Sequence, residues 1–114
     1  MNLGIVGSRS FQDAPLMKKW ILKFLATNKD LTIVSGGANG ADQIAKSIAH
    51  DMKLKYREFK PDWSIGKSAG PIRNKQIIDS SDTILAFWDC ASRGTKNTID
   101  QAISNKIPII IIPF

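Results

Sequence analysis

Short apolar runs alternate along the chain with longer stretches in which apolar residues recur at helical spacing. The segment 15–28 shows the helical pattern well, because Leu16, Trp20 and Phe24 follow one another every four residues. Asp13 and Pro15 stand at its start, where an N-capping carboxylate and a first-turn proline are both typical. The pattern therefore predicts an amphipathic helix opened by these two residues.

The same alternation continues to the end of the chain. Helical spacing predicts helices at 41–52, 72–81 and 95–105, and apolar runs predict strands at 3–7, 31–35, 54–59, 83–88 and 107–112. The segment 60–71 is rich in proline, glycine and serine, which predicts a loop. Continuous β-branched runs flanked by helices are typical of a parallel sheet covered on both faces. We therefore expect an α/β, Rossmann-like three-layer sandwich of about five mostly parallel strands, formed as one domain by residues 1–114.

Composition narrows the classes of partner and site. The formal net charge of +6 favours a polyanionic partner or a phosphate-bearing ligand, although the lysines are scattered rather than clustered. A single cysteine and a single histidine exclude an internal disulfide and a cysteine or multi-histidine metal site, so no metal is expected. The longest apolar run is too short to span a bilayer, and we expect no signal peptide. These features favour a cytoplasmic protein.

Four loops follow the predicted strands, and they hold the candidate chemistry. They read GSRSF, SGGANGAD, PDWSIGKSAGPIRN and DCASRGT. In open α/β sheets, ligands bind outside the carboxyl ends of the strands, where helix N-termini also point. We therefore expect the side chains of these loops to share one ligand site.

The loop SGGANGAD is the main candidate for holding a phosphate. Gly37 and Gly40 match the last two glycines of a G-x-G-x-x-G fingerprint, and Ser35 takes the place of the first. Glycine lets the backbone approach a phosphate closely, and Ser35 and Asn39 add side-chain donors. The alternative is a tight strand-to-helix turn that binds nothing. Asp42 would then be only a favourable charge in the first helical turn.

The other loops add cations and hydroxyl groups at the same edge. Arg9 follows the first strand and Arg73 opens the third helix beside Asn74, so both guanidinium groups are candidates to contact phosphate or carboxylate. Ser92 and Thr95 offer hydroxyl groups around Gly94, and Thr95 is a candidate helix N-cap. The candidate ligand-binding residues of these loops thus also include Asn74, Ser92, Gly94 and Thr95.

Two further features of the loops bear on nucleotide binding. Gly66-Lys67-Ser68 is not the end of a phosphate-binding P-loop, because Pro61 stands where that motif requires glycine. Trp63 and Trp88 lie near strand ends, where an indole can stack on a base, with plain packing as the alternative.

Taken together, the motifs GSRSF, IVSGGANGAD, DWSIGKSAGPIRN and FWDCASRGT resemble, in order and spacing, the YspA/YpsA-related branch of the SLOG superfamily. That superfamily includes the DNA-processing protein of natural transformation and the lonely-guy enzymes, which remove ribose phosphate from nucleoside monophosphates. The resemblance implies a Rossmann-like fold, a pocket for a nucleotide or nucleotide-sugar ligand, and frequent homo-oligomers. Onto this sequence it carries the following ligand-binding residues: Gly7, Ser8, Arg9, Ser35, Gly36, Gly37, Gly40, Asp42, Gly70, Arg73, Asn74, Gly94 and Thr95.

One departure from the resemblance bears on catalysis. The lonely-guy enzymes carry P-G-G-x-G-T-x-x-E, whereas Gly94-Thr95 is followed here by Lys96, and the first acid comes only at Asp100. Cleavage at a ribose carbon needs a carboxylate near the developing positive charge. Asp42 and Asp89 are the catalytic candidates.

Three functions therefore stay open. The first is a sensor or sequestering module for a nucleotide-derived small molecule, such as ADP-ribose, NAD, or a cyclic or nucleotide-sugar relative. The second is a hydrolase that cleaves an N-glycosidic or phosphate bond in that ligand, as implied by the resemblance. The third is a DNA-binding protein, which the net charge also favours.

Overall fold

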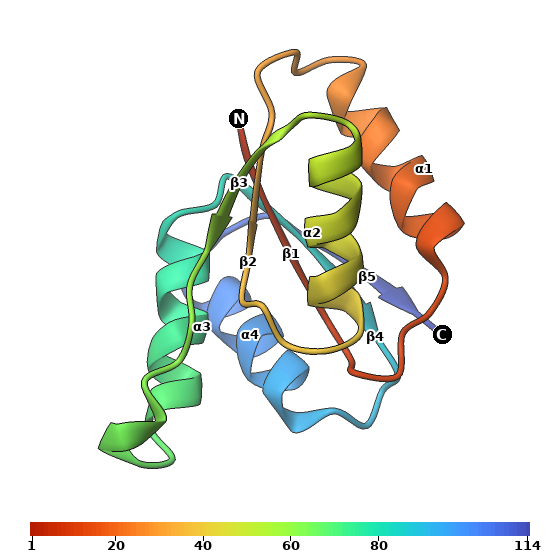
Figure 1. The fold of residues 1–114 in the computed structure, drawn as a ribbon. Coiled ribbons are helices and arrows are strands. Elements are labelled where there is room, and N and C mark those ends of the chain that lie inside the picture. The colour runs from red at the N-terminus through yellow and green to blue at the C-terminus, as the bar shows by residue number, and fades with distance from the viewer.

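A computed structural model describes all residues, 1–114, and shows five strands and four α-helices in the expected alternation (Figure 1). The elements are β1 (Asn2–Gly7), α1 (Ala14–Leu25), β2 (Thr32–Ser35), α2 (Ala41–Asp51), β3 (Lys55–Glu58), the short 3₁₀-helix η1 (Trp63–Ile65), α3 (Ala69–Asp79), β4 (Thr83–Trp88), α4 (Arg93–Ser104) and β5 (Ile109–Pro113).

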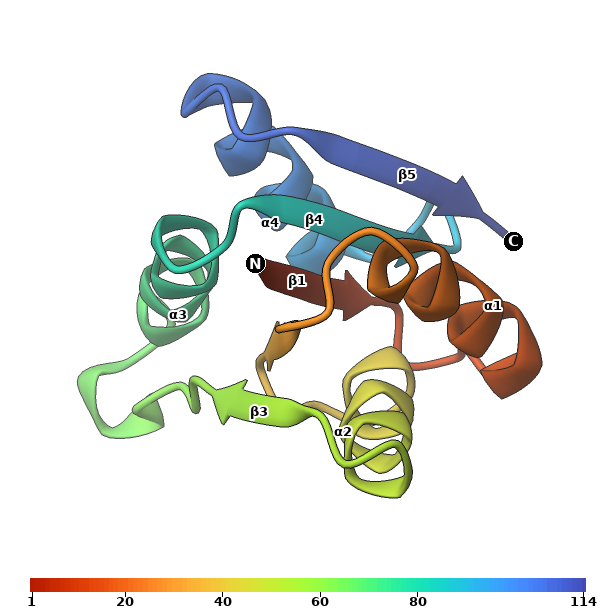
Figure 2. The ribbon, with the colours of Figure 1, turned by 90° about the horizontal axis from the view of Figure 1, so that it is seen from above.

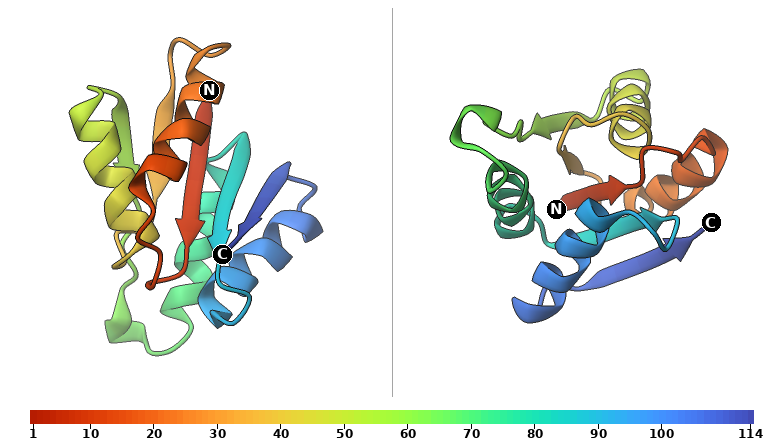
Figure 3. Two further views of the ribbon diagram at one scale, coloured as in Figure 1. Left: turned by 90° about the vertical axis from the view of Figure 1, so that its right-hand side faces the viewer. Right: turned by 90° about the horizontal axis from the view of Figure 1, so that it is seen from below.

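The strands form one sheet in the order β3-β2-β1-β4-β5, and every neighbouring pair is parallel. Helices α1 and α2 cover one face of the sheet, and α3 and α4 cover the other (Figures 2 and 3). The fold is therefore the Rossmann-like three-layer α/β sandwich that the sequence predicts, and all of its strands are parallel.

Two hydrophobic cores lie on the two faces of the sheet, because successive side chains of a strand point to opposite sides. In β1, Leu3 and Ile5 pack against α1 and α2, whereas Val6 faces α3 and α4. In β4, Phe87 lies in the first core and Ala86 in the second. Burial on both faces explains why these central strands read as continuous apolar runs.

Helix α1 begins as its sequence predicts. The carboxylate of Asp13 accepts a hydrogen bond from the backbone N–H of Leu16 (3.1 Å), and Pro15 lies in the first turn. Trp20 packs partly buried against the first core, with Lys23 Nζ 4.6 Å from the centre of its ring. Lys18, Lys19 and Lys23 lie on the exposed side of the helix, as expected for an amphipathic helix, and Leu22 is exposed among them.

The segment 60–71 is more ordered than predicted. Helix α3 begins at Ala69, three residues before the predicted start, so Gly70 lies inside its first turn rather than in a loop. Pro71 fits there because the N–H groups of a first turn have no intrahelical partner. Before α3, the carboxylate of Asp62 caps η1 by accepting from the backbone N–H of Ser64 (3.2 Å).

The strand order reverses between β1 and β4, which makes this the topological switch point of the sheet. From β1 the chain passes through α1 to β2 on one side, and from β3 it passes through α3 to β4 on the other side. The loops after β1 and β4 therefore diverge at the carboxyl ends of two neighbouring strands, where ligands bind in sheets of this kind.

Candidate functional site

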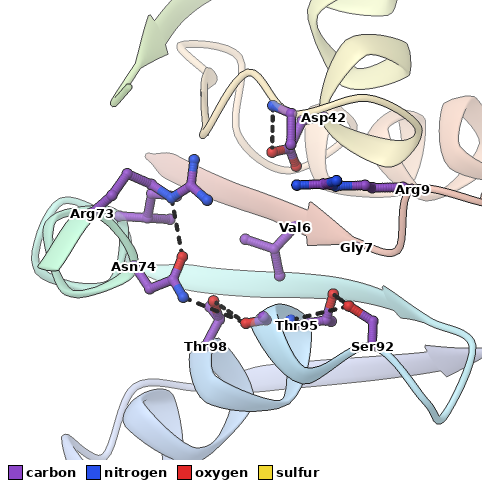
Figure 4. A pocket seen from close by; sticks show the side chains of 12 residues that line it. Val6, Gly7, Arg9, Asp42, Arg73, Asn74, Ser92, Thr95 and Thr98 are labelled. Atoms are coloured by element: carbon purple, nitrogen blue, oxygen red, sulfur yellow. Dashed lines mark hydrogen bonds between the residues drawn. The ribbon is translucent and has the colours of Figure 1, made fainter. Parts of the chain in front are cut away.

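A cavity of about 100 Å³, the inner cavity, lies at this switch point (Figure 4). Its walls come from the end of β1, the loop before α2 and the start of that helix, the inward side of α3 and the first turns of α4. The lining residues are Val6, Gly7, Arg9, Ala38, Asp42, Arg73, Asn74, Ile77, Ser92, Gly94, Thr95 and Thr98.

Asp42 is buried at the N-terminus of α2, with 5 % of its surface exposed. Its Oδ2 accepts a hydrogen bond from the backbone N–H of Ala38 (3.1 Å), whereas Oδ1 is buried and has no hydrogen-bond partner. Burial raises the pKa of this carboxyl from 3.8 to about 6, against the opposing effects of the Ala38 hydrogen bond and the positive charge of Arg73. The cavity thus holds a carboxyl group that can exchange a proton near neutral pH.

Arg73 and Arg9 enter the site from opposite sides (Figure 4). Arg73 donates from Nη1 to the carbonyl of Gly36 (2.9 Å) and from Nε to Oδ1 of Asn74 (3.0 Å). Burial lowers the pKa of Arg73, Asp42 raises it, and the positive charge of Arg9 lowers it further. Two guanidinium groups therefore repel each other beside one largely desolvated carboxyl, an arrangement that an anionic ligand would relieve.

The first turns of α4 form the opposite wall. Ser92 is the N-cap: its Oγ accepts from the backbone N–H of Thr95 (3.4 Å), so the prediction that Thr95 caps this helix is wrong. Thr95 lies within the first turn, three residues after the cap, because α4 begins at Arg93 and not at residue 95. Asn74 reaches across from α3 and donates to Asn97 Oδ1 (3.0 Å), which ties the two helices together beside the cavity.

A second cavity of about 430 Å³, the outer cavity, adjoins the first. Its lining residues are Arg9, Gly36, Gly37, Ala38, Asn39, Lys60, Pro61, Trp63 and Arg73. Arg9, Ala38 and Arg73 line both cavities, so the arginine pair stands at the boundary between them. The backbone N–H groups of Gly37 and Asn39 donate no hydrogen bond within the protein, which leaves them free for a ligand.

The structure brings together most of the residues that the sequence singles out. Arg9, Asp42 and Arg73 meet at the two cavities as expected. Eight of the expected residues line the inner cavity: Gly7, Arg9, Asp42, Arg73, Asn74, Ser92, Gly94 and Thr95. The outer cavity adds three more: Gly36, Gly37 and Asn39.

Four expected residues lie beside the cavities without lining them. Ser35 is fully buried and its Oγ donates to the carbonyl of Ile5 (2.8 Å). Ser8 Oγ accepts from the backbone N–H of Asp89 (3.0 Å). Both hydroxyl groups therefore hold the sheet and its loops in place. Gly40 and Gly70 also lie outside the two linings.

The two catalytic candidates differ in placement. Only Asp42 lines a cavity. The carboxylate of Asp89 accepts from the backbone N–H groups of Ser92 (2.8 Å) and Ala91 (2.9 Å), and these hydrogen bonds lower its pKa. Asp89 thus shapes the turn before α4, as a carboxylate in an Asx-turn does.

Sequence reasoning missed several residues of the linings. Ile77 and Thr98 lie three residues after Asn74 and Thr95, so the helical period would have placed them on the same faces. Val6 precedes Gly7 on the face of β1 that points to α3 and α4. For Ala38, Lys60 and Pro61 the residue types carry no signal of their own.

No helix has both the length and the apolar character that crossing a membrane requires. No group of three or more histidine, cysteine, aspartate or glutamate side chains is arranged to hold a metal ion.

The parallel sheet, the cavities at its switch point and the converging arginines define a Rossmann-like α/β protein with a cationic pocket. The model of the YspA, cpYpsA-related SLOG family matches residues 2–66. The Gene 61 protein of Mycobacterium phage D29 is 33% identical over 114 residues, covering 93% of this chain and 91% of its own length. The chain therefore belongs to the YspA, cpYpsA-related SLOG family.

Solved structures of the same fold are more distant in sequence. DNA processing protein A (DprA) from Streptococcus pneumoniae superposes with a TM-score of 0.77 at 20% identity, over 99% of this chain and 50% of DprA. DprA from Helicobacter pylori, described by its single-stranded DNA binding mode, gives 0.71 at 21% identity, over 100% of this chain and 66% of its own. TM1055, a structural genomics target, gives 0.70 at 15% identity, over 95% of this chain and 71% of its own. This chain spans about half the length of pneumococcal DprA.

Proposed function

We propose that this protein binds a phosphate-bearing, nucleotide-derived small molecule at the two cavities, as a sensor or sequestering module. ADP-ribose, NAD and cyclic or nucleotide-sugar relatives are the ligand classes considered. The observation that carries the proposal is the convergence of Arg9 and Arg73 beside a buried carboxyl that has an unpaired oxygen. Membership of the SLOG family supports the same class of ligand.

The electrostatics of the site favour an anion. Arg9 and Arg73 bring two positive charges, and the pKa of about 6 leaves Asp42 as the single, partly protonated countercharge near neutral pH. Guanidinium groups bind phosphate through strong, often bidentate hydrogen bonds, and Arg73 is half-buried whereas Arg9 is exposed. The free N–H groups of Gly37 and Asn39 add donors in the outer cavity, and the N-terminus of α2 contributes Asp42 to the inner cavity.

Calorimetric titration with ADP-ribose, NAD and AMP tests this proposal. The variant is Arg73→Gln, and Arg57→Gln is the matched control, because Arg57 is exposed on β3, stacks on the ring of Phe59 and lines neither cavity. A lost charge-assisted hydrogen bond costs about 1.5–3 kcal/mol, which predicts a roughly 10- to 150-fold weaker complex for Arg73→Gln. Binding that is absent in the wild type, or equal in both variants, would reject the site.

A hydrolase that cleaves the same ligand is the second candidate, favoured by the placement of Asp42. Its carboxyl lies in the inner cavity with a pKa of about 6, near the value that suits general acid–base catalysis at neutral pH. Chromatography of ADP-ribose or AMP incubated with the protein detects turnover. The hydrolase predicts products that disappear in Asp42→Asn while ligand binding persists, whereas a sequestering module returns its ligand intact.

DNA binding is a third candidate. The net charge of +6 and the fold shared with the Helicobacter pylori DprA structure support it. Fluorescence anisotropy with single-stranded DNA at increasing salt tests it. The logarithm of the binding constant should fall linearly with the logarithm of the salt concentration, with a slope of about −0.7 for each phosphate contacted. Affinity that is independent of salt argues against DNA as the partner.

That the chain forms a homo-oligomer stays a prediction, which light scattering of the purified protein would test.

A further inference from the structure

Trp63 is the most exposed of the three tryptophans and stands in the wall of the outer cavity. Its side chain belongs to η1, between β3 and α3, and 60% of the residue is exposed. Trp20 is partly buried against the first core, and Trp88 donates from Nε1 to the carbonyl of Ser92 (3.0 Å). The indole of Trp63 therefore has free apolar surface that the fold itself does not cover.

Helix α3 supports this exposed ring from one side. A Cβ atom at Gly70 would lie 3.4 Å from Cη2 and 3.8 Å from Cζ3 of Trp63, so the benzene edge of the indole rests near the helix backbone. Because Gly70 has no side chain, the indole of Trp63 can lie close to the first turn of α3, beside the cavity. The support also gives the ring a fixed place in relation to Arg73, which stands one turn further along the same helix.

The outer cavity combines this aromatic wall with a cationic one. Arg9, Arg73 and Lys60 line it together with Trp63, and the two arginines also line the inner cavity. Aromatic rings beside cationic groups are the combination that binds nucleotides, because a base stacks on the ring while its phosphates contact the cations. The volume of about 430 Å³ falls within the usual range of small-molecule pockets, about 300–1,000 Å³.

We propose that the outer cavity is a nucleobase subsite in which Trp63 stacks on the base. The inference rests on the proposed nucleotide-binding function and deepens it by giving the ligand a direction. The phosphates contact Arg9 and Arg73 at the boundary, and the group beyond the phosphates enters the inner cavity. The inner cavity, at about 100 Å³, is the smaller of the two, so the outer cavity takes the base and the inner cavity takes the sugar at the far end of the ligand.

The polar lining of the inner cavity suits such a sugar. Thr95 and Thr98 place hydroxyl oxygens there, and Oδ1 of Asp42 is a buried acceptor without a donor, which a ligand hydroxyl group can supply. The amide of Asn74 already donates to Asn97 Oδ1 (3.0 Å). This hydrogen-bonding lining suits the hydroxyl groups of a terminal ribose, so ADP-ribose is the probe used in the test below.

Titration calorimetry with two probes, ADP-ribose and inorganic pyrophosphate, tests the base subsite. Trp63→Ala is expected to weaken ADP-ribose binding roughly 5- to 150-fold, the range that corresponds to losing one base–aromatic stack. The same variant is expected to bind pyrophosphate as the wild type does, because pyrophosphate has no base. Trp63→Phe retains a ring and should keep most of the affinity for ADP-ribose.

Ile65→Ala is the matched control, because Ile65 lies in the same turn, is 53% exposed and lines neither cavity. Thermal melting of each variant checks that it folds. In a Trp20→Phe/Trp88→Phe background, the fluorescence of Trp63 should be quenched by ADP-ribose and unchanged by pyrophosphate.

The outcomes separate the inference from the function on which it rests. If the wild type binds neither probe, both the proposed function and the base subsite are rejected. If the wild type binds both probes and Trp63→Ala weakens them equally or not at all, the base subsite is wrong and the phosphate site stands. An equal loss in Ile65→Ala would instead assign the turn a structural or docking role and overturn the inference.

Discussion

The buried carboxyl of Asp42 makes the stability of the ligand-free protein depend on pH in a direction opposite to that of most paired carboxylates. The perturbation to test is Asp42→Asn. The amide oxygen of the new side chain can still accept the hydrogen bond from the backbone N–H of Ala38, so the loop keeps its contact. The variant therefore removes the ionisation of Asp42 with little change in shape.

The magnitude follows from the pKa. Burial raises the pKa of Asp42 from 3.8 to about 6, and each pKa unit is worth about 1.4 kcal/mol, so ionising this group in the folded protein costs about 3 kcal/mol. The folded state holds its proton between these two pH values while the unfolded state has released it. The wild type is thus favoured at low pH and loses about 3 kcal/mol of stability as the pH rises through 6.

Urea unfolding of the ligand-free wild type and Asp42→Asn at pH 4, 6 and 8 measures this difference. We expect the two proteins to be similar near pH 4 and the variant to be more stable by about 3 kcal/mol at pH 8. Asp79→Asn is the control, since Asp79 is exposed and its pair with Lys75 is a surface salt bridge worth under about 1 kcal/mol. A difference between wild type and Asp42→Asn that is the same at pH 4 and pH 8 would refute the reasoning.

Three smaller predictions concern the loops and caps around the cavities. Gly40→Ala should destabilise the protein by about 2–4 kcal/mol in urea unfolding, because Gly40 has φ +77° and its added Cβ would clash with the backbone of Arg9. Gly94→Ala, where an added Cβ meets nothing within 4 Å, should change the same free energy of unfolding by less than about 1 kcal/mol. Ser92→Ala should cost about 1 kcal/mol in thermal or urea unfolding, since it removes the side-chain acceptor for Thr95; an unchanged midpoint would contradict the cap.

The fold was predictable because its signals are local. Runs such as 83–88 read as buried strands, and the spacing from Leu16 to Phe24 reads as a helix, so element order and the parallel sheet follow. The errors lie where local signals conflict. Gly70 and Pro71 are typical of loops, yet both fit the first turn of α3 because that turn needs no amide donor to close it.

The site was predictable as a set of loops but not as a set of contacts. The parallel-sheet rule places Arg9, Asp42 and Arg73 at one edge. It does not show that Arg73 reaches across 37 positions to the carbonyl of Gly36, or that Ser35 turns its hydroxyl to the backbone of β1. Such contacts depend on side-chain packing between elements, which no local pattern encodes.

The glycines of the loop after β2 have structural reasons of their own, apart from any ligand. The sequence suggests that they admit a phosphate, but the structure gives two of them an internal reason. A Cβ at Gly36 would clash with the guanidinium of Arg73, and one at Gly37, which has φ +75°, would lie 2.6 Å from the carboxyl carbon of Glu58. The loop is thus packed against charged side chains of its own protein.

That packing also orders the loop for binding. The carbonyls of Gly36 and Gly37 accept hydrogen bonds from Arg73 (2.9 Å) and Gln43 (2.8 Å), and Asp42 holds the N–H of Ala38. The N–H groups of Gly37 and Asn39 are then left without a protein acceptor in a loop that these three hydrogen bonds hold in place. A ligand phosphate would meet a donor that is already positioned, so little of the binding free energy is spent on ordering the loop.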